Sequence, residues 1–134
     1  RRGLTVTAVD FSAEALSKTA ALAREQGVAV ECRRLDLESP AVDVGREAWD
    51  LMCGFFFLHR AVFPALRDAL RPGGLIIYKT YTTDQLRYPG RPRHPTHLLE
   101  PNELLRLLEG FRVLRYEEIW QGRGTAAIAA RKPG

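Results

Sequence analysis

The chain has 134 residues, of which 46% are hydrophobic and 27% are charged, a composition typical of one compact globular domain rather than a disordered chain. No apolar run approaches the roughly 20 residues that a membrane span needs, and the two cysteines lack metal-ligand spacing, so we expect a cytoplasmic protein with reduced thiols. The net charge of +4 comes mainly from scattered arginines, and this scatter favours neither nucleic-acid nor membrane binding.

The chain opens on a run of β-branched and apolar residues at 5–10, which predicts a buried parallel strand ending in Asp10. Ser12 can cap a helix directly after this strand, and Gly27 can close that helix. Parallel strands of an α/β sheet present their carboxyl ends to the ligand. A carboxylate there can accept hydrogen bonds from both hydroxyls of a ribose, so we interpret Asp10 as a nucleoside-binding residue.

Two further strands are predicted before the middle of the chain. The first, at 28–33, ends near Asp36 and is followed by a broken crossover at 38–47 that has room for a short helix. The second is the most apolar run of the chain, 49–58, which predicts a fully buried central strand that leads into the ligand crevice.

The second half of the chain predicts more alternation of helices and strands. In order we expect a helix at 61–70, a strand at 75–81, an irregular excursion at 82–99, a helix at 101–110 and two strands at 111–120 and 125–131. A loop as long as the excursion is usually functional in a compact domain. The sequence therefore predicts an α/β fold in a single domain over 1–134, with a doubly wound sheet and a C-terminal antiparallel hairpin.

Four short motifs follow one another along the chain: Val9-Asp10-Phe11-Ser12, Leu35-Asp36-Leu37, Trp49-Asp50-Leu51 and Leu70-Arg71-Pro72-Gly73-Gly74. In this order they resemble the motifs of class I S-adenosylmethionine-dependent methyltransferases. The closing part, from Phe55-Phe56-Phe57-Leu58-His59-Arg60 to the final hairpin, is similar to the small-molecule branch related to tellurite-resistance methyltransferases. The resemblance implies a Rossmann-like sheet, S-adenosylmethionine as cofactor and methyl transfer to a small-molecule acceptor. It covers nearly all of the chain.

The resemblance also implies the cofactor contacts. Asp10 would hold the ribose hydroxyls, and Phe11 would flank the adenine. Asp36 would accept a hydrogen bond from the adenine amino group, with the backbone of Leu37 beside it; the alternative for Asp36 is a turn residue. Gly54-Phe55, at the end of the central strand, would lie beside the methionine portion of the cofactor and the reacting methyl.

Methyl transfer is an in-line displacement on a sulfonium, so the protein needs mainly to bind the cofactor, align the acceptor and exclude water. If a base is required, His59 is the candidate, and the alternative for His59 is a helix-start residue bonded to the backbone. The excursion at 82–99 would act as a lid whose charge suits an anionic or polarizable acceptor; the alternative is a solvated loop. The candidate acceptor contacts are Tyr81, Arg87, Arg91, Arg93 and His94. His94 and His97 lack a third ligand nearby, so we expect no metal site.

The strand and glycine-rich turn that precede the Asp10 strand in this family have no counterpart in the sequence. That strand would lie between the strands at 5–10 and 49–58, and without it two rows of backbone groups would lack partners. We therefore expect a fragment of a longer protein, direct closure of the two strands, or a gap filled by another chain, such as the second copy in a homodimer. Because the amides of the turn bind the amino-acid end of the cofactor, we expect binding to be weak or absent, reduced by about a hundredfold or more.

Two other function classes stay open. In an NAD-binding dehydrogenase domain Asp10 would bind the adenosine ribose equally well, although such a fold requires neither Asp36 nor the terminal hairpin. In a non-catalytic domain the methyltransferase architecture would act through self-association or a partner, and the absence of the glycine-rich turn favours this class.

Overall fold

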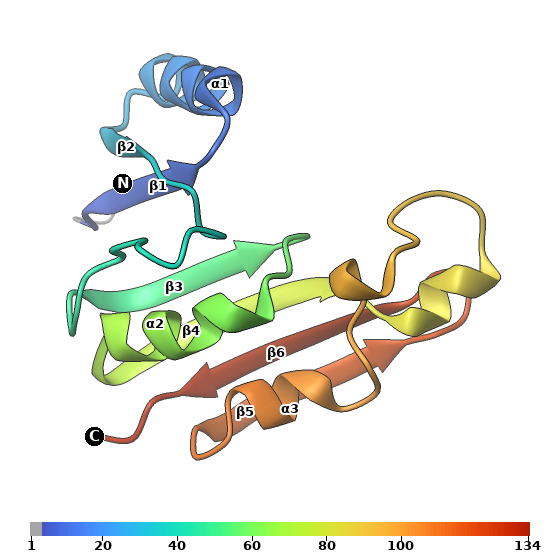
Figure 1. The fold of residues 1–134 in the computed structure, drawn as a ribbon. Coiled ribbons are helices and arrows are strands. Elements are labelled where there is room, and N and C mark those ends of the chain that lie inside the picture. The colour runs from blue at the N-terminus through green and yellow to red at the C-terminus, as the bar shows by residue number, and fades with distance from the viewer. Residues whose placement is uncertain (1–3) are drawn as a thin grey trace. The chain divides into compact units, whose positions relative to one another are not determined.

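The computed structural model describes residues 4–134, which form two compact units, one up to Val42 and one from Asp43 onward (Figure 1). Each unit has its own sheet, with two strands in the first and four in the second. No helix in the described part of the chain is long and apolar enough to cross a membrane.

The first unit is a strand, a helix and a second strand: β1 (Val6–Asp10), α1 (Ala13–Glu25) and β2 (Val30–Arg34). The two strands pair in parallel. Ser12 caps α1 as predicted, because its hydroxyl accepts a hydrogen bond from the Ala15 N–H at 3.1 Å. Gly27 follows the helix with φ +67°, the left-handed conformation that commonly ends a helix.

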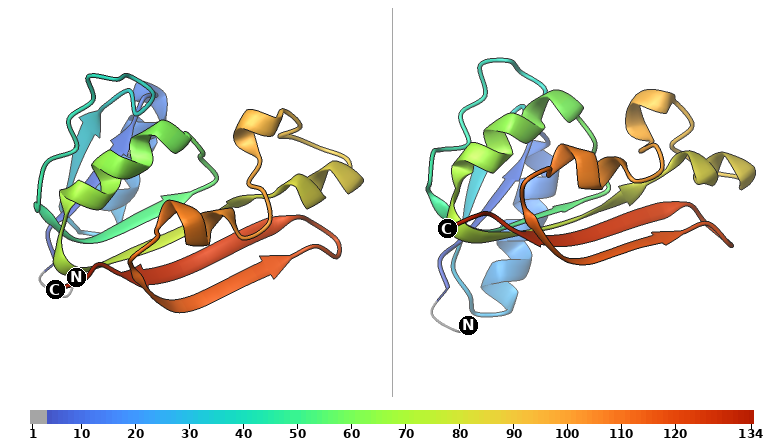
Figure 2. Two further views of the ribbon diagram at one scale, coloured as in Figure 1. Left: turned by 60° about the horizontal axis from the view of Figure 1, so that its bottom comes forward. Right: turned by 90° about the horizontal axis from the view of Figure 1, so that it is seen from below.

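The second unit is built on a mixed sheet in the order β3-β4-β6-β5, in which only β3 and β4 are parallel. Its elements are β3 (Trp49–Phe55), η1 (Arg60–Val62), α2 (Phe63–Ala69), β4 (Leu70–Tyr81), η2 (Thr83–Arg87), η3 (Pro95–His97), α3 (Glu103–Leu107), β5 (Arg112–Ile119) and β6 (Thr125–Arg131). Figure 2 shows α2 and α3 on the same face of this sheet. The predicted C-terminal hairpin is present as β5 and β6.

The core of the second unit lies between these two helices and the face of the sheet that they cover. β4 and β6 contribute cross-strand pairs of buried residues to that face. The pairs are Ile76 with Ala130, Tyr78 with Ile128 and Thr80 with Ala126. Phe63 of α2 packs on Tyr78, with the ring centroids 5.1 Å apart. The covered face is therefore set by the alternation of side chains along β4 and β6.

Two strands that were expected to be buried are not. Every residue of β1 is exposed or half-buried. In β3, Leu51 and Phe55 are 47% and 55% exposed, so the prediction of a fully buried central strand is wrong. Among the described residues β1 pairs only with β2 and β3 only with β4, which makes each an edge strand. The helices of the second unit also cover only one face of its sheet, and Leu51 and Phe55 lie on the other.

Three smaller differences concern element boundaries. β4 begins at Leu70 rather than at residue 75, because Leu70 already pairs with Trp49 and Gly73 donates its N–H to Lys132 O at 3.0 Å. α3 is only five residues long. The crossover at 38–47 contains no helix. The excursion at 82–99 is irregular, as predicted, apart from the short 3-10 turns η2 and η3.

Candidate functional site

Asp10 and Asp36 lie at the carboxyl ends of the two parallel strands of the first unit. Asp10 ends β1, Asp36 follows β2, and the Leu35 N–H donates to Asp10 O at 3.0 Å, so the two strand ends lie side by side. One carboxylate oxygen of each residue accepts a local backbone N–H, from Ser12 at 2.9 Å and from Glu38 at 3.0 Å. Both carboxylates are exposed, and among the described residues their second oxygens have no partner.

Phe11 stands beside this pair, with 61% of its surface exposed. The guanidinium of Arg34 lies over its ring at 5.3 Å from the centroid and also donates to Phe11 O at 2.8 Å. Sequence reasoning missed Arg34, which looked like one of many scattered arginines. Leu37 is half-buried next to Asp36. Together these groups offer anionic acceptors and an exposed aromatic ring, which suit a ligand with hydroxyl donors and a planar base.

Gly54, in the second unit, is required by packing. A Cβ at this position would lie 2.6 Å from Cδ2 of Tyr78, the residue that pairs with Gly54 on β4. The Tyr78 ring cannot easily move, because it is buried against Phe63 and its hydroxyl donates to Phe57 O. Burial also raises the pKa of Tyr78, so its hydroxyl stays protonated. A cofactor contact at Gly54 remains a prediction.

Phe56 is a residue at the end of β3 that sequence reasoning did not single out. Its φ is +57°, a left-handed conformation that costs a bulky residue about 1–3 kcal/mol. The turn places its ring 5.1 Å from the ring of Tyr81 at the end of β4, and its N–H donates to Lys79 O at 2.8 Å. Phe55 and Phe56 are both exposed. The carboxyl ends of β3 and β4 thus present an aromatic surface made of Phe55, Phe56 and Tyr81.

His59 directly precedes η1 and is half-buried. Its carbonyl accepts the Val62 N–H at 3.1 Å, but its side chain makes no capping hydrogen bond. The imidazole has no hydrogen-bond partner among the described residues. This leaves it available for proton transfer, and its role as a base remains a prediction.

The loop of residues 82–99 is tied down at several points. Arg93 donates to the carbonyls of Leu86 and Tyr88, each at 2.8 Å, and of Gly90 at 3.2 Å. The Tyr88 hydroxyl donates to Trp120 O at 2.6 Å and accepts the Gly122 N–H at 2.9 Å, which attaches the loop to the β5–β6 turn. These bonds attach the loop to the rest of the second unit, while most of its residues between 86 and 97 are exposed, so its role as a lid remains a prediction.

The other candidate acceptor contacts in this loop differ in how far they are engaged. Arg87 and Arg91 are exposed, and Arg87 makes only a 3.9 Å ion pair with Asp84. His94 contacts Thr96 through Nδ1. No cluster of three or more potential metal ligands occurs within residues 4–134.

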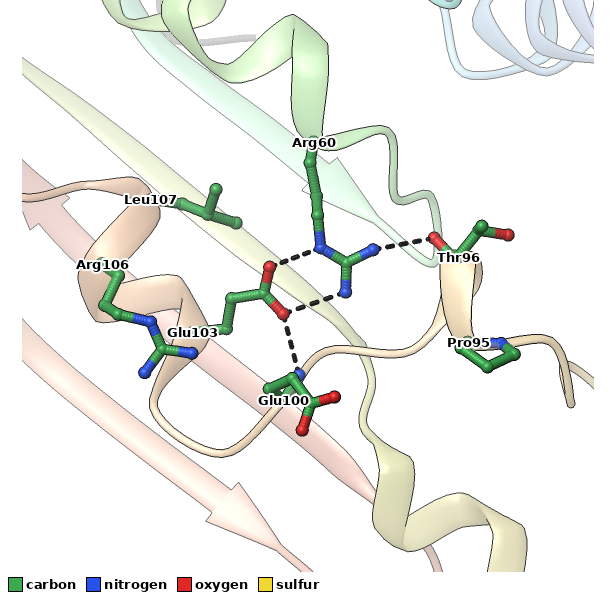
Figure 3. Close-up of a pocket in the computed structure, with 7 residues that line it drawn as sticks. All are labelled: Arg60, Pro95, Thr96, Glu100, Glu103, Arg106 and Leu107. Atoms are coloured by element: carbon green, nitrogen blue, oxygen red, sulfur yellow. Dashed lines mark hydrogen bonds and ion pairs between the residues drawn. The ribbon is translucent and has the colours of Figure 1, made fainter.

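An open pocket of about 520 Å³ lies beside the end of this loop (Figure 3). Its lining residues are Arg60, Pro95, Thr96, Glu100, Glu103, Arg106 and Leu107. Arg60 and Glu103 form an ion pair at its centre, and the hydrogen bond from Arg60 lowers the pKa of Glu103. No sequence signal links these two residues, which are 43 positions apart.

No protein-family model matches the chain, and neither does any curated protein. Solved structures do match it. The [4+2]-cyclase SpnF is 18% identical, with a TM-score of 0.74 over 97% of this chain and 66% of its own. TehB from Haemophilus influenzae is 15% identical, with a TM-score of 0.77 over 97% of this chain and 50% of its own. A SAM-dependent methyltransferase from Methanosarcina mazei is 16% identical, with a TM-score of 0.72 over 98% of this chain and 84% of its own.

The chain has the class I methyltransferase fold, which confirms the predicted Rossmann-like α/β class. It spans between half and two thirds of the length of SpnF and TehB. Sequence identities this low establish the fold alone, and the presence of a cyclase among the matches agrees with the rule that one fold supports several reactions.

Proposed function

We propose that this chain carries the adenosine-binding carboxylates of an S-adenosylmethionine-dependent methyltransferase that acts on a small molecule. The pair Asp10 and Asp36 carries the proposal, because each carboxylate ends a parallel strand, is exposed, and keeps one oxygen without a partner in the described part of the chain. Asp10 would accept from the ribose hydroxyls and Asp36 from the adenine amino group, with Phe11 and Leu37 against the base. The cofactor would supply the electrophilic methyl group.

The acceptor side of the proposal rests on the second unit. The exposed Phe55 and Phe56 rings at the end of β3, with half-buried Tyr81 at the end of β4, can exclude water from a methyl-transfer site. The unpartnered His59 imidazole can take a proton from an acceptor that must lose one. Gly54 and Phe55 would lie beside the methionine portion of the cofactor and the reacting methyl. The candidate acceptor contacts are Tyr81, Arg87, Arg91, Arg93 and His94. The positive charge of the three arginines suits a small anionic or polarizable acceptor, as in the tellurite-resistance branch.

The proposal is tested by adding S-adenosylmethionine, up to about 10 mM, to the isotope-labelled chain and following its amide resonances. We expect binding weaker than micromolar, with shifts concentrated at residues 10–12 and 36–38. Asp10→Asn and Asp36→Asn should each weaken binding by about tenfold, the value of one charge-assisted hydrogen bond. Glu14→Gln is the matched control, because Glu14 is an exposed acid on α1 with only a surface ion pair to Lys18.

Three results would count against this proposal. Wild-type resonances that do not move, or asparagine variants that bind like the wild type, would remove the assigned adenosine site. A parallel titration with NADH that shifts the same amides when S-adenosylmethionine does not would favour a dinucleotide-binding domain instead.

A second candidate function is self-association without catalysis, and the free edge of β3 favours it. Among the described residues one edge of β3 has no partner strand, and Leu51, Cys53 and Phe55 are exposed on the uncovered face next to that edge. Unpaired, apolar strand edges promote pairing with another chain. Sedimentation should then show a mass that rises with concentration, and Leu51→Lys should abolish the rise. A chain that stays monomeric and binds S-adenosylmethionine would exclude this function.

A further inference from the structure

We propose that Arg60 is a positioning residue that holds the distal part of the 82–99 loop, at residues 96–98, against the start of α3 and the segment after β3. The role of Arg60 in holding the loop does not depend on the proposed function. Only the suggestion that the loop contacts a methyl acceptor rests on it. It concerns the candidate site because Arg60 adjoins His59, the candidate base, while the residues that it holds adjoin His94, a candidate acceptor contact.

The Arg60 guanidinium contacts two segments distant in sequence (Figure 3). Nη1 donates to Thr96 O at 3.2 Å. Nη2 donates to Leu98 O at 2.7 Å. Nη2 also donates to Glu103 Oε1 at 2.9 Å, while Nε donates to Glu103 Oε2. The same Glu103 oxygen Oε1 accepts the Glu100 N–H at 2.8 Å. One side chain therefore joins the loop, the approach to α3 and the first turn of α3.

These contacts require arginine and not merely a positive charge. The planar guanidinium spreads five N–H donors over three nitrogens, so it can serve a carboxylate on one edge and carbonyls on another. A lysine ammonium has one nitrogen and cannot occupy all these positions at once. Without the guanidinium, the carbonyls of Thr96 and Leu98 lose their side-chain donor, and the buried Glu103 carboxylate keeps only the Glu100 N–H.

The amide hydrogen bonds of η3 are local, so they do not tie this turn to other elements, although the side chain of Leu98 at its end is buried. The N–H groups of Thr96, His97 and Leu98 donate only to His94 or Pro95 within the same turn. The Leu99 N–H, in contrast, donates to Tyr81 O at the end of β4. Arg60 thus supplies side-chain bonds that connect the turn at 94–98 to the rest of the unit.

The Arg71–Asp50 ion pair provides a matched comparison on the same unit. Its N···O distance is 2.9 Å, but its side chains are 49% and 83% exposed, against 36% and 11% for Arg60 and Glu103. Exposed single contacts of this kind are weak and do not order a loop. Substitution of Arg71 therefore controls for the loss of a positive charge and for the loss of an ion pair.

Hydrogen exchange of the full chain tests the inference in Arg60→Met, Arg60→Lys and the control Arg71→Met. In Arg60→Met we expect the amides of residues 96–98 to exchange at least about tenfold faster, while the amides of β6 keep their wild-type rates. Arg60→Lys should restore little of this protection, and Arg71→Met should exchange like the wild type in both segments.

Wild-type exchange at 96–98 in Arg60→Met would overturn the inference, and so would full protection in Arg60→Lys. Equal acceleration of 96–98 and β6 would also overturn it, because Arg60 would then support global stability rather than the loop. The assay needs no cofactor. The exchange experiment can therefore refute the role of Arg60 without bearing on the proposed function. The proposed function is refuted separately, when the wild-type resonances do not respond to S-adenosylmethionine.

Discussion

Replacing Gly54 by alanine tests how closely β3 and β4 are packed. Two effects oppose each other. An alanine in a strand is favoured over glycine by about 0.5–1 kcal/mol, because glycine loses more backbone freedom on folding. The added methyl, however, would lie 2.6 Å from Cδ2 and 3.3 Å from Cζ of Tyr78, well inside ordinary van der Waals contact.

The steric overlap should outweigh the gain in backbone entropy and make the substitution destabilising. The reason is that Tyr78 is only 2% exposed and its ring is held by Phe63 and by its hydrogen bond to Phe57. Forcing an extra methyl into a packed core costs about 1–3 kcal/mol, so we expect Gly54→Ala to lower the free energy of unfolding by about 1–2 kcal/mol. Combining it with Tyr78→Leu, which makes room for the methyl, should give a smaller loss than the sum of the two single variants.

The assay is urea unfolding followed by tryptophan fluorescence. The chain has two tryptophans, Trp49 and Trp120, and both lie in the second unit, so the signal reports on the unit that carries the substitution. A Gly54→Ala protein as stable as the wild type, or more stable, would refute the reasoning. So would strict additivity with Tyr78→Leu.

Three further outcomes are expected. Ser12→Ala should destabilise α1 by about 1 kcal/mol, seen as faster amide exchange confined to the first unit, because the N-cap hydrogen bond is lost. Tyr88→Phe should lower the urea stability of the second unit by up to about 1 kcal/mol, because the hydroxyl that bridges the loop to Trp120 is lost. The hydrogen bond from Arg60 lowers the folded-state pKa of Glu103, so the ionised Glu103 carboxylate stabilises the fold at neutral pH. This stabilisation is lost as the pH falls through the folded-state pKa. The difference in the free energy of unfolding between wild type and Glu103→Gln, measured by urea titration, should therefore shrink below about pH 4.

Local rules were enough to predict most of the elements. Ser12 and Gly27 bound α1, because a side-chain acceptor before a helix and a residue tolerant of positive φ after it act within a few residues. The four residues between the last two strand-like runs likewise predicted the hairpin. The position of Asp10 and Asp36 at strand ends follows from the same local boundaries, so these two candidates were readable from the sequence.

Exposure was harder to predict, because it depends on what lies beside a strand and not on its own residues. The apolar run 49–58 has the composition of a central strand, yet β3 is an edge strand with exposed Leu51 and Phe55. Phe56 illustrates a similar limit: three consecutive phenylalanines do not reveal which one turns into a left-handed conformation.

The α/β class, the order of the elements and the two acidic strand ends can be predicted from the sequence, because hydrophobic period, capping and glycine or proline breaks act over short distances. The packing of Tyr78 that requires glycine at position 54, and the contacts of Arg60 with Glu103 and the end of the loop, emerge only in the folded chain. Those contacts join residues 24 to 43 positions apart, and their geometry arises only when the sheet and its connecting loops are assembled.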